Sequence, residues 1–538
     1  MAEQPTTQPN ASEIRSQMMR GGPGRPGKIE KAHNPRRALV RLVEYLKPYA
    51  LILSLVFGFI LASTVLALVG PYLMGQAIDK FIAVKKISGL ATVALWMLVV
   101  YILGNLFNAA SGWIMAGVSQ KALKGLRRDL FGHLQTLSIK FFDTNTAGEL
   151  MSRLTNDIDA INQAVSQNVV SLVASVLSMA GILIAMFIMD VWLTLAALAV
   201  VPLMVWFTQF VARYTRKGFR ELQKNLGAMT SVSEEAISGQ RVIKAFRRND
   251  SVIEAFRKSN EDVYHAAIYA NTYALLLMPL SNQLGNLFVI TIAGLGGYLA
   301  LKGLVTIGTI AAFISYGRAY VAPLQQLSTI YNAIQGALAG AERIFEVIDT
   351  ESEVDVAPEV AALDRVKGHV TFDNVQFSYN PDKPIIKNLT LEAEPGEIVA
   401  LVGPTGAGKT TLVNLLTRFY EIDAGQICID GRDIRHIKKD DLRLQLGLVL
   451  QDTFLFSASV MDNIRYGRLK ATDEEVIDAA RMADADLFIQ KLPQGYETML
   501  SERASNLSQG QRQMLSIARA ILANPCLLYT SPSPRDCS

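Results

Sequence analysis

The chain begins with a long region rich in apolar segments and continues into a region of mixed character. Six apolar stretches occur in the first region, and most approach the 20 or so residues that a helix needs to cross a bilayer. They are residues 49–69, 90–108, 165–189, 192–210, 273–299 and 307–321. This pattern predicts six transmembrane helices. The last stretch is the shortest, and by itself it also fits a buried helix of a soluble domain.

The segments before the first stretch are polar and basic. Residues 1–35 contain a Gly- and Pro-rich run without apolar side chains to bury, and we expect them to be disordered. Residues 36–47 are amphipathic and basic and end before Pro48. This pattern predicts a helix that lies along the membrane surface.

The connections between the apolar stretches predict the topology. Those after the first, third and fifth stretches are short, whereas those after the second and fourth are long, basic and periodic like helices. Because Lys and Arg accumulate on the cytoplasmic side, we expect the N-terminus and both long connections there. Lys80, Lys85 and Lys86 in the first outer loop oppose this orientation weakly. Residues 36–348 therefore form an expected transmembrane domain with cytoplasmic helical extensions.

Composition agrees with a membrane part joined to a soluble part. Of 538 residues, 50% are hydrophobic and 19% are charged, and mean hydropathy is +0.24. A net charge of +4 gives little reason to propose a nucleic-acid partner. The three cysteines lack CxxC or zinc spacing, so the sequence indicates neither a disulfide framework nor a metal site. Acidic and small residues at 349–368 predict a linker to a second domain.

A glycine-rich loop carries the strongest chemical signal in this second domain. The sequence Gly403, Pro404, Thr405, Gly406, Ala407, Gly408, Lys409 and Thr410 matches GxxxxGK[ST]. Residues 398–402 before it are predicted to be a buried parallel strand, and Thr411 and the residues after it to open a helix. Backbone N–H groups would cradle phosphates there, Lys409 would reach the outer phosphates and Thr410 would hold Mg²⁺. The alternative is a glycine turn without a ligand.

Two weaker signals flank this loop. Tyr379 ends a strand-like segment, where its ring could stack on adenine, although simple packing also explains a tyrosine there. Ser508, Gln509, Gly510 and Gln511 precede a helical run that reaches residue 522. This predicts a second helix N-terminus suited to phosphate.

In their order along the chain, these motifs resemble those of ABC exporters. Tyr379, residues 403–410, Gln451 and residues 507–511 resemble the A-loop, Walker A motif, Q-loop and signature sequence, and residues 502–503 resemble the X-loop. Residues 141–150, 153–157 and 239–246 resemble membrane-domain segments of the same family, the first being a coupling segment. The resemblance covers residues 36–525.

This resemblance implies an all-α six-helix transmembrane domain followed by an α/β P-loop nucleotide-binding domain. It implies one half of a dimer, with a second half-transporter as homo- or heterodimeric partner, in a plasma membrane of bacterial type with the nucleotide domain in the cytosol. Each ATP, with Mg²⁺, would lie between the P-loop of one chain and the signature of the other. The resemblance gives Lys409 and Gln451 catalytic roles, and Gln451 would join Thr410 at the magnesium.

The end of the chain departs from the family pattern. Ser531 and Pro532 occupy the positions where the family has an Asp-Glu pair, and no histidine follows His436. Residues 526–538 resemble a translated sequencing adapter. We therefore expect an incomplete nucleotide-binding domain at 369–525, a non-native tail and an inactive chain as printed; a frameshifted protein is the alternative. Because proline donates no ladder hydrogen bond, we also expect no central strand in this tail.

The leading functional hypothesis is ATP-driven export by one half of a dimeric transporter, and its rival is a degenerate, non-hydrolysing subunit of a heterodimer. Six spans and the signature exclude a soluble P-loop kinase. The spans carry few ionisable groups and scattered amides, which favours a lipophilic or amphipathic substrate, although some amides simply bond neighbouring helices. These amides belong to Asn105, Asn108, Gln209, Asn282, Gln283 and Asn286.

Overall fold

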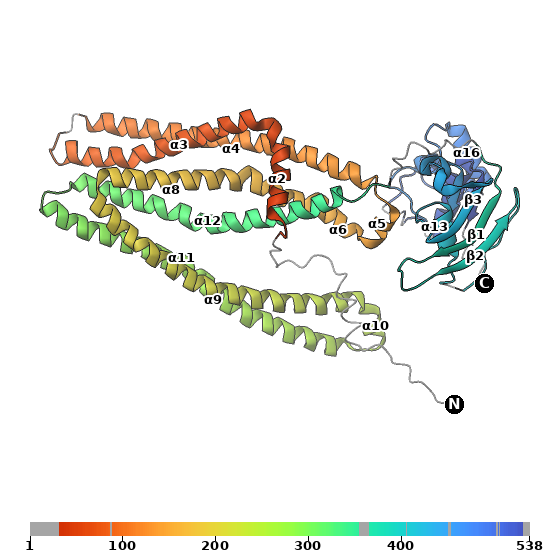
Figure 1. Cartoon of the computed structure of the whole chain (residues 1–538). Coiled ribbons are helices and arrows are strands. Elements are labelled where there is room, and N and C mark those ends of the chain that lie inside the picture. Colours follow the sequence, from red (N-terminus) through yellow and green to blue (C-terminus); the bar gives the residue numbers. More distant parts are fainter. Residues whose placement is uncertain are drawn as a thin grey trace. The chain divides into compact units, whose positions relative to one another are not determined.

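The computed structural model describes residues 32–86, 89–353, 365–404, 406–449, 453–501, 504 and 506–530. The chain forms two compact units (Figure 1). Unit 1 comprises Met1–Gln135 and Thr146–Thr350, and unit 2 comprises Thr136–Asn145 and Glu351–Ser538. Most of the polar N-terminus predicted to be disordered, residues 1–31, lies outside the described residues, as do residues 354–364 of the predicted linker.

The described residues of unit 1 form helices joined by short connections. Its elements are α2 Pro35–Leu46, α3 Ala50–Ala77 with η2 Ile78–Ile82, α4 Leu90–Leu134, the run α6 Ala147–Ser152, η3 Arg153–Asp157, α7 Ile158–Gln163, η4 Ala164–Asn168 and α8 Val169–Met189, then α9 Val191–Ser238, α10 Gln240–Ala245, α11 Asn249–Leu301 and α12 Ile307–Ile348. Each predicted apolar stretch lies essentially within one of the long helical runs. The basic connections continue α4, α9 and α11 as helix, which confirms their predicted helical extension.

Three helical segments in the described part of the chain are long and apolar enough to cross a membrane. They are Pro35–Ile82, Leu90–Leu134 and Ala147–Met189. Shorter apolar pieces, Val191–Leu203 and Gly285–Leu301, lie within α9 and α11. By length and composition three spans are therefore supported, and the count of six remains a prediction.

Close backbone contact joins α3 to the beginning of α12. A Cβ added at Gly75 would lie 2.8 Å from the carbonyl oxygen of Gly308, and a Cβ at Gly308 would meet the Gly75 carbonyl in turn. The Asp79 carboxylate accepts hydrogen bonds from Gly308 N at 2.8 Å and Thr306 Oγ1 at 2.6 Å. Asp79 thus satisfies a backbone N–H in the first turn of α12, beside this close contact.

Unit 2 contains α5 Ile139–Thr144 and a mixed α/β domain. The strands β1 Val370–Phe377, β2 Ile386–Ala393, β3 Ala424–Ile429 and β4 Arg432–Asp433 form an antiparallel sheet in the order β2-β1-β3-β4. A second sheet pairs β5 Leu446–Val449 with β6 Leu527–Thr530 in parallel. The helices are α13 Lys409–Leu416, α14 Lys439–Leu444, α15 Val460–Arg465, α16 Asp473–Met482, α17 Asp486–Ile489 and α18 Gln509–Ala523.

Two hydrophobic cores organise this domain. One lies under the antiparallel sheet and includes Phe372, Val375 and Leu415 of α13. The other joins α15, α16 and α18 and includes Ile464, Val476 and Leu515. The P-loop helix therefore belongs to the sheet core, whereas the helix after the signature belongs to a separate helical core.

One strand prediction is wrong. Residues 398–402 form no strand, and Ile398 and Val402 are 96% and 92% exposed. Among the described residues no neighbouring strand supplies hydrogen bonds to this segment, so its apolar side chains have no layer to pack against. Leu527–Thr530 of the tail forms a strand, with Leu527 opposite Leu446 and Thr530 opposite Val449, but within the described part of the chain it pairs only with β5 and is not a central strand. Its apolar and aromatic residues favour a strand, and the described part of the tail ends before Pro532.

Candidate functional site

The glycine-rich loop leads directly into α13. Gly406 and Gly408 have φ values of +88° and +92°, a left-handed backbone that side chains disfavour. Gly408 is the N-cap of α13, so Lys409 is the first helical residue. Lys409 Nζ donates hydrogen bonds to the carbonyl oxygens of Gly403 at 2.6 Å and Pro404 at 3.1 Å. The ammonium group therefore lies against the loop, where it would meet an anion bound by the loop.

The threonines after Lys409 face different surroundings. Thr410 is exposed on the first turn of α13. Thr411 is buried, and its Oγ1 lies 3.4 Å from the Tyr379 hydroxyl. The structure thus brings together the predicted residues 403, 404, 406–411 and 379, while Thr405 lies outside the described residues.

Tyr379 stands beside α13 with part of its ring open to solvent. The side chain is 42% exposed. Its hydroxyl also accepts a hydrogen bond from Asn414 Nδ2 at 3.2 Å. The ring meets those of Phe377 and Tyr420 edge-on, at 4.8 Å between centroids in each case. These contacts fix a partly open aromatic ring near the glycine-rich loop, in agreement with the predicted stacking on a base.

Sequence reasoning missed Tyr420. Its hydroxyl donates a hydrogen bond to Asp143 Oδ2 of α5, within unit 2. Burial and this bond raise the pKa of Tyr420 above its ordinary value. A chain of contacts therefore runs from Thr411 through Tyr379 and Tyr420 to α5. The aromatic residues alone gave no signal for it, because it depends on a contact across 277 residues of sequence.

The signature residues form the beginning of α18, as predicted. Ser508 is the N-cap, and Gln509 is the first helical residue. The Ser508 hydroxyl accepts a hydrogen bond from Gln511 N at 3.3 Å, and Gln511 Oε1 accepts one from Ser508 N at 2.9 Å. Gly510 is exposed, with open space around it. The Ser-x-x-Gln spacing carries this capping-box signal, which the sequence reasoning did not use.

Arg519 connects α18 to the segment that follows the predicted Q-loop. Its guanidinium donates hydrogen bonds to Asn463 O at 2.8 Å, Asn463 Oδ1 at 3.2 Å and Phe454 O at 3.2 Å. Buried Asn463 in turn accepts a bond from Phe456 N at 2.8 Å. The segment after residue 452 is therefore fixed to the signature helix. Gln451 itself and the X-loop residues 502–503 lie outside the described residues.

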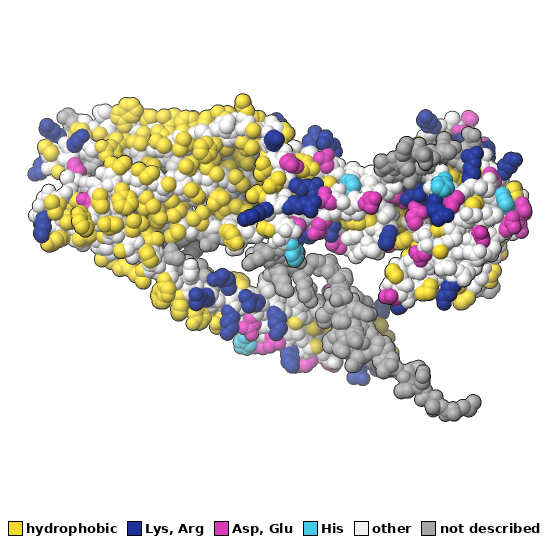
Figure 2. All heavy atoms as spheres, viewed as in Figure 1, with side chains coloured by type: hydrophobic (Ala, Val, Ile, Leu, Met, Phe, Trp, Pro, Cys, Tyr) yellow, Lys and Arg dark blue, Asp and Glu magenta, His cyan; other side chains and the backbone are white. Residues whose placement is uncertain are grey.

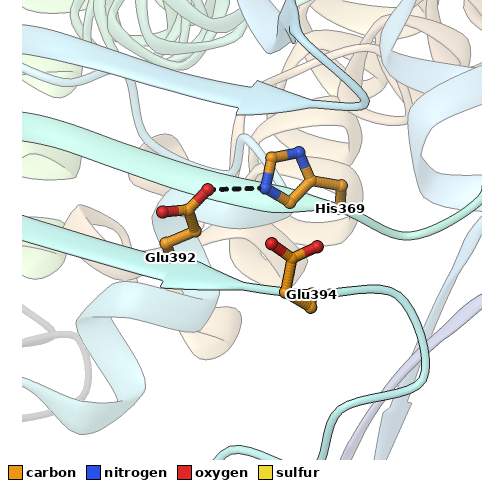
Figure 3. Close-up of side chains that lie close together, drawn as sticks. All are labelled: His369, Glu392 and Glu394. Atoms are coloured by element: carbon orange, nitrogen blue, oxygen red, sulfur yellow. Dashed lines mark hydrogen bonds and ion pairs between the residues drawn. The ribbon is translucent and has the colours of Figure 1, made fainter.

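A separate trio gathers on the antiparallel sheet (Figure 3). His369, Glu392 and Glu394 bring their potential ligand atoms within 4.8 Å of one another. The 2.9 Å hydrogen bond between His369 Nε2 and Glu392 already accounts for their approach, and both glutamates are exposed. We assign no metal-binding role to this trio.

Comparisons with known proteins agree with the two units. Residues 53–324 match the family model described as ABC transporter transmembrane region, and residues 386–530 match the one described as ABC transporter. The chain is 40% identical to the uncharacterized ABC transporter ATP-binding protein YfiC of Bacillus subtilis, over 93% of this chain and 83% of that protein.

Two further relatives have more specific names. A fatty acid ABC transporter ATP-binding/permease protein of Mycobacterium bovis is 41% identical over 84% of this chain and 70% of its own length. An ATP-dependent lipid A-core flippase of Syntrophus aciditrophicus is 34% identical over 93% of this chain and 80% of its own length. Together with the phosphate loop and the signature helix, these matches show that the chain belongs to the ABC transporter family, with a transmembrane region and an ATP-binding domain in one polypeptide.

Proposed function

We propose that this chain is one half of a dimeric exporter that uses ATP to move a lipophilic or amphipathic molecule across the membrane. The observation that carries the proposal is that the P-loop and the signature begin two separate helices in one chain. The described residues contain no hydrogen bond between residues 403–411 and 508–511. A second copy or a related half would then complete each nucleotide site.

Different site residues would contact different parts of ATP. Amides of the loop and the N-terminus of α13 would bind phosphate oxygens, and Lys409 would neutralise the outer phosphates. Mg²⁺ would be held by Thr410 and Gln451 and would offset the charge that develops during phosphoryl transfer. Tyr379 would stack on adenine, and Ser508, Gln509, Gly510 and Gln511 of the partner would face the same phosphates.

Transmission to the membrane helices would pass through α5. Closure of the nucleotide domains would shift α5 because Tyr420 is bonded to Asp143. ATP can shift the equilibrium from the open to the closed dimer only to the extent that it binds the closed dimer more tightly than the open one. The nucleotide domains and the basic helical extensions would face the cytosol, in agreement with the excess of Lys and Arg there.

The substrate class follows from the lining of the spans and from the relatives' names. The expected spans carry few ionisable groups, which disfavours a compact ion. Fatty acid and lipid A-core are the cargoes in the names of two relatives, and both are amphipathic. We therefore propose that the exported substrate carries an acyl chain.

Inverted membrane vesicles provide the test. Vesicles that contain a version in which an exporter-type continuation with the Asp-Glu pair and the histidine replaces residues 526–538 should accumulate a fluorescent fatty acid or phospholipid when MgATP is added. Vesicles with Lys409→Ala should show less than about a tenth of that rate. ATP-independent accumulation equal in both preparations would contradict the proposal, whereas ATP-driven uptake of another amphiphile only would correct the substrate.

A further inference from the structure

A cavity of about 500 Å³ lies in unit 1 beside the beginning of the first span. Residues of α2, of the turn Pro48–Tyr49 and of α4 line it. We propose that this cavity binds the phosphate headgroup of an anionic lipid from the adjacent leaflet. The proposal concerns a site outside the nucleotide domain and does not depend on which substrate is exported.

The cavity carries an excess of positive charge. Four cations line it, Arg41, Lys121, Lys124 and Arg128, against the two carboxylates Glu44 and Asp129. A phosphate group would therefore enter a positive environment. Negative lipid headgroups attract basic segments at the membrane surface for the same reason.

The existing bonds leave the two lysines available. Asp129 accepts hydrogen bonds from the Tyr45 hydroxyl at 3.1 Å and from Arg128 Nη2 at 2.9 Å. Arg41 pairs with Asp349 at 2.6 Å. Lys121 and Lys124 are exposed and make no hydrogen bond or ion pair within the described residues. Asp129 is thus neutralised by its neighbours, and the two ammonium groups of Lys121 and Lys124 outnumber the remaining carboxylate of Glu44.

The position of the cavity favours a lipid over a soluble phosphate. Leu51, just after Tyr49, is 84% exposed, and Trp113 of α4 is 81% exposed. Trp113 precedes Lys121 by eight residues, about 12 Å along a helix. Figure 2 shows the hydrophobic surface of α3 and α4 giving way to Lys and Arg side chains. If the lysines hold the phosphate of a lipid, its acyl chains would reach this apolar surface. A free phosphate has no acyl chains and gains nothing from the surface.

Lipid binding to the full chain tests the proposal. The protein in nanodiscs of phosphatidylcholine would be titrated with fluorescent phosphatidylglycerol. We expect the double variant Lys121→Gln and Lys124→Gln to bind this lipid about tenfold more weakly. The control Lys217→Gln and Lys224→Gln removes two exposed lysines from α9, another basic helix, and should change binding less than twofold.

A conservative variant separates charge from folding. Lys121→Arg with Lys124→Arg should restore binding to within about threefold of the wild type, because both charges return. Equal phosphatidylglycerol binding by the glutamine variant and the α9 control would overturn the proposal. So would displacement of the labelled lipid by millimolar inorganic phosphate, which would identify a general anion site without lipid recognition.

Discussion

Tyr420 of the nucleotide domain donates its hydroxyl hydrogen bond to Asp143 of α5, and its ring packs edge-on against Tyr379. This relationship joins the aromatic side chain proposed for adenine to the short helix proposed for coupling. Because both contacts lie within unit 2, they form one connected group beside the P-loop helix.

Tyr420→Phe removes the hydrogen bond and keeps the ring. A hydrogen bond of this kind contributes about 1 kcal/mol, so backbone amides of residues 139–144 should exchange with deuterium about fivefold faster. ATP affinity should change less than threefold. Tyr496→Phe is the matched control, because it removes the tyrosine–aspartate bond to Asp486 at 2.8 Å in the helical core. Unaltered exchange of residues 139–144 in Tyr420→Phe would show that the bond does not hold α5.

The same bond should tolerate ordinary changes of pH. Burial, followed by the bond to Asp143, raises the pKa of Tyr420. A tyrosine with a raised pKa contributes its stabilisation fully below its unfolded pKa, about 10, and loses it as the pH rises through the folded value. Protection of residues 139–144, corrected for intrinsic exchange, should therefore be equal at pH 6.5 and 8.5. A fall in protection over this interval would contradict the assignment.

Arg519→Met should loosen the attachment of the signature helix. The substitution leaves the Asn463 and Phe454 carbonyl groups without their charged donor, so the helical core should lose about 2–3 kcal/mol. Thermal unfolding followed by limited proteolysis of residues 453–523 measures this loss. Arg481→Met is the control, because Arg481 is exposed and its pairs with Asp478 at 3.1 Å and Asp486 at 3.8 Å contribute under about 1 kcal/mol. Equal melting temperatures of the two variants would show that Arg519 does not hold the signature helix in place.

Gly308→Ala should disturb the contact between α3 and α12. The added methyl group would meet the Gly75 carbonyl and the Asp79 carboxylate, and overpacking of this kind costs about 1–3 kcal/mol. The melting temperature of the protein in detergent should fall clearly. Gly58→Ala on α3, where a Cβ meets nothing within 4 Å, should melt as the wild type does. A Gly308→Ala protein as stable as Gly58→Ala would indicate a looser contact than the structure has.

The sequence predicted the helices well because long apolar or amphipathic periodicity is a local property. It placed the P-loop before α13 and Ser508 before α18 for the same reason, since glycine and capping residues act on their nearest neighbours. The strand predicted at residues 398–402 is wrong, because a strand needs a neighbouring strand for its hydrogen bonds and the local sequence pattern does not show whether one is present. Sequence reasoning also missed Tyr420 and Arg519, whose contacts join segments 277 and 56–65 residues apart.

Equilibrium binding of ATP to the purified chain in nanodiscs tests the central claim, that ATP binds at the loop 403–411, most directly. Lys409→Ala keeps the loop amides but removes the charge opposite the outer phosphates, so affinity should fall at least about tenfold. Lys470→Ala, an exposed lysine of the helical region, should bind ATP as the wild type does. Saturable ATP binding that is lost only with Lys409 is the predicted result, and equal binding by the wild type and Lys409→Ala would contradict the account.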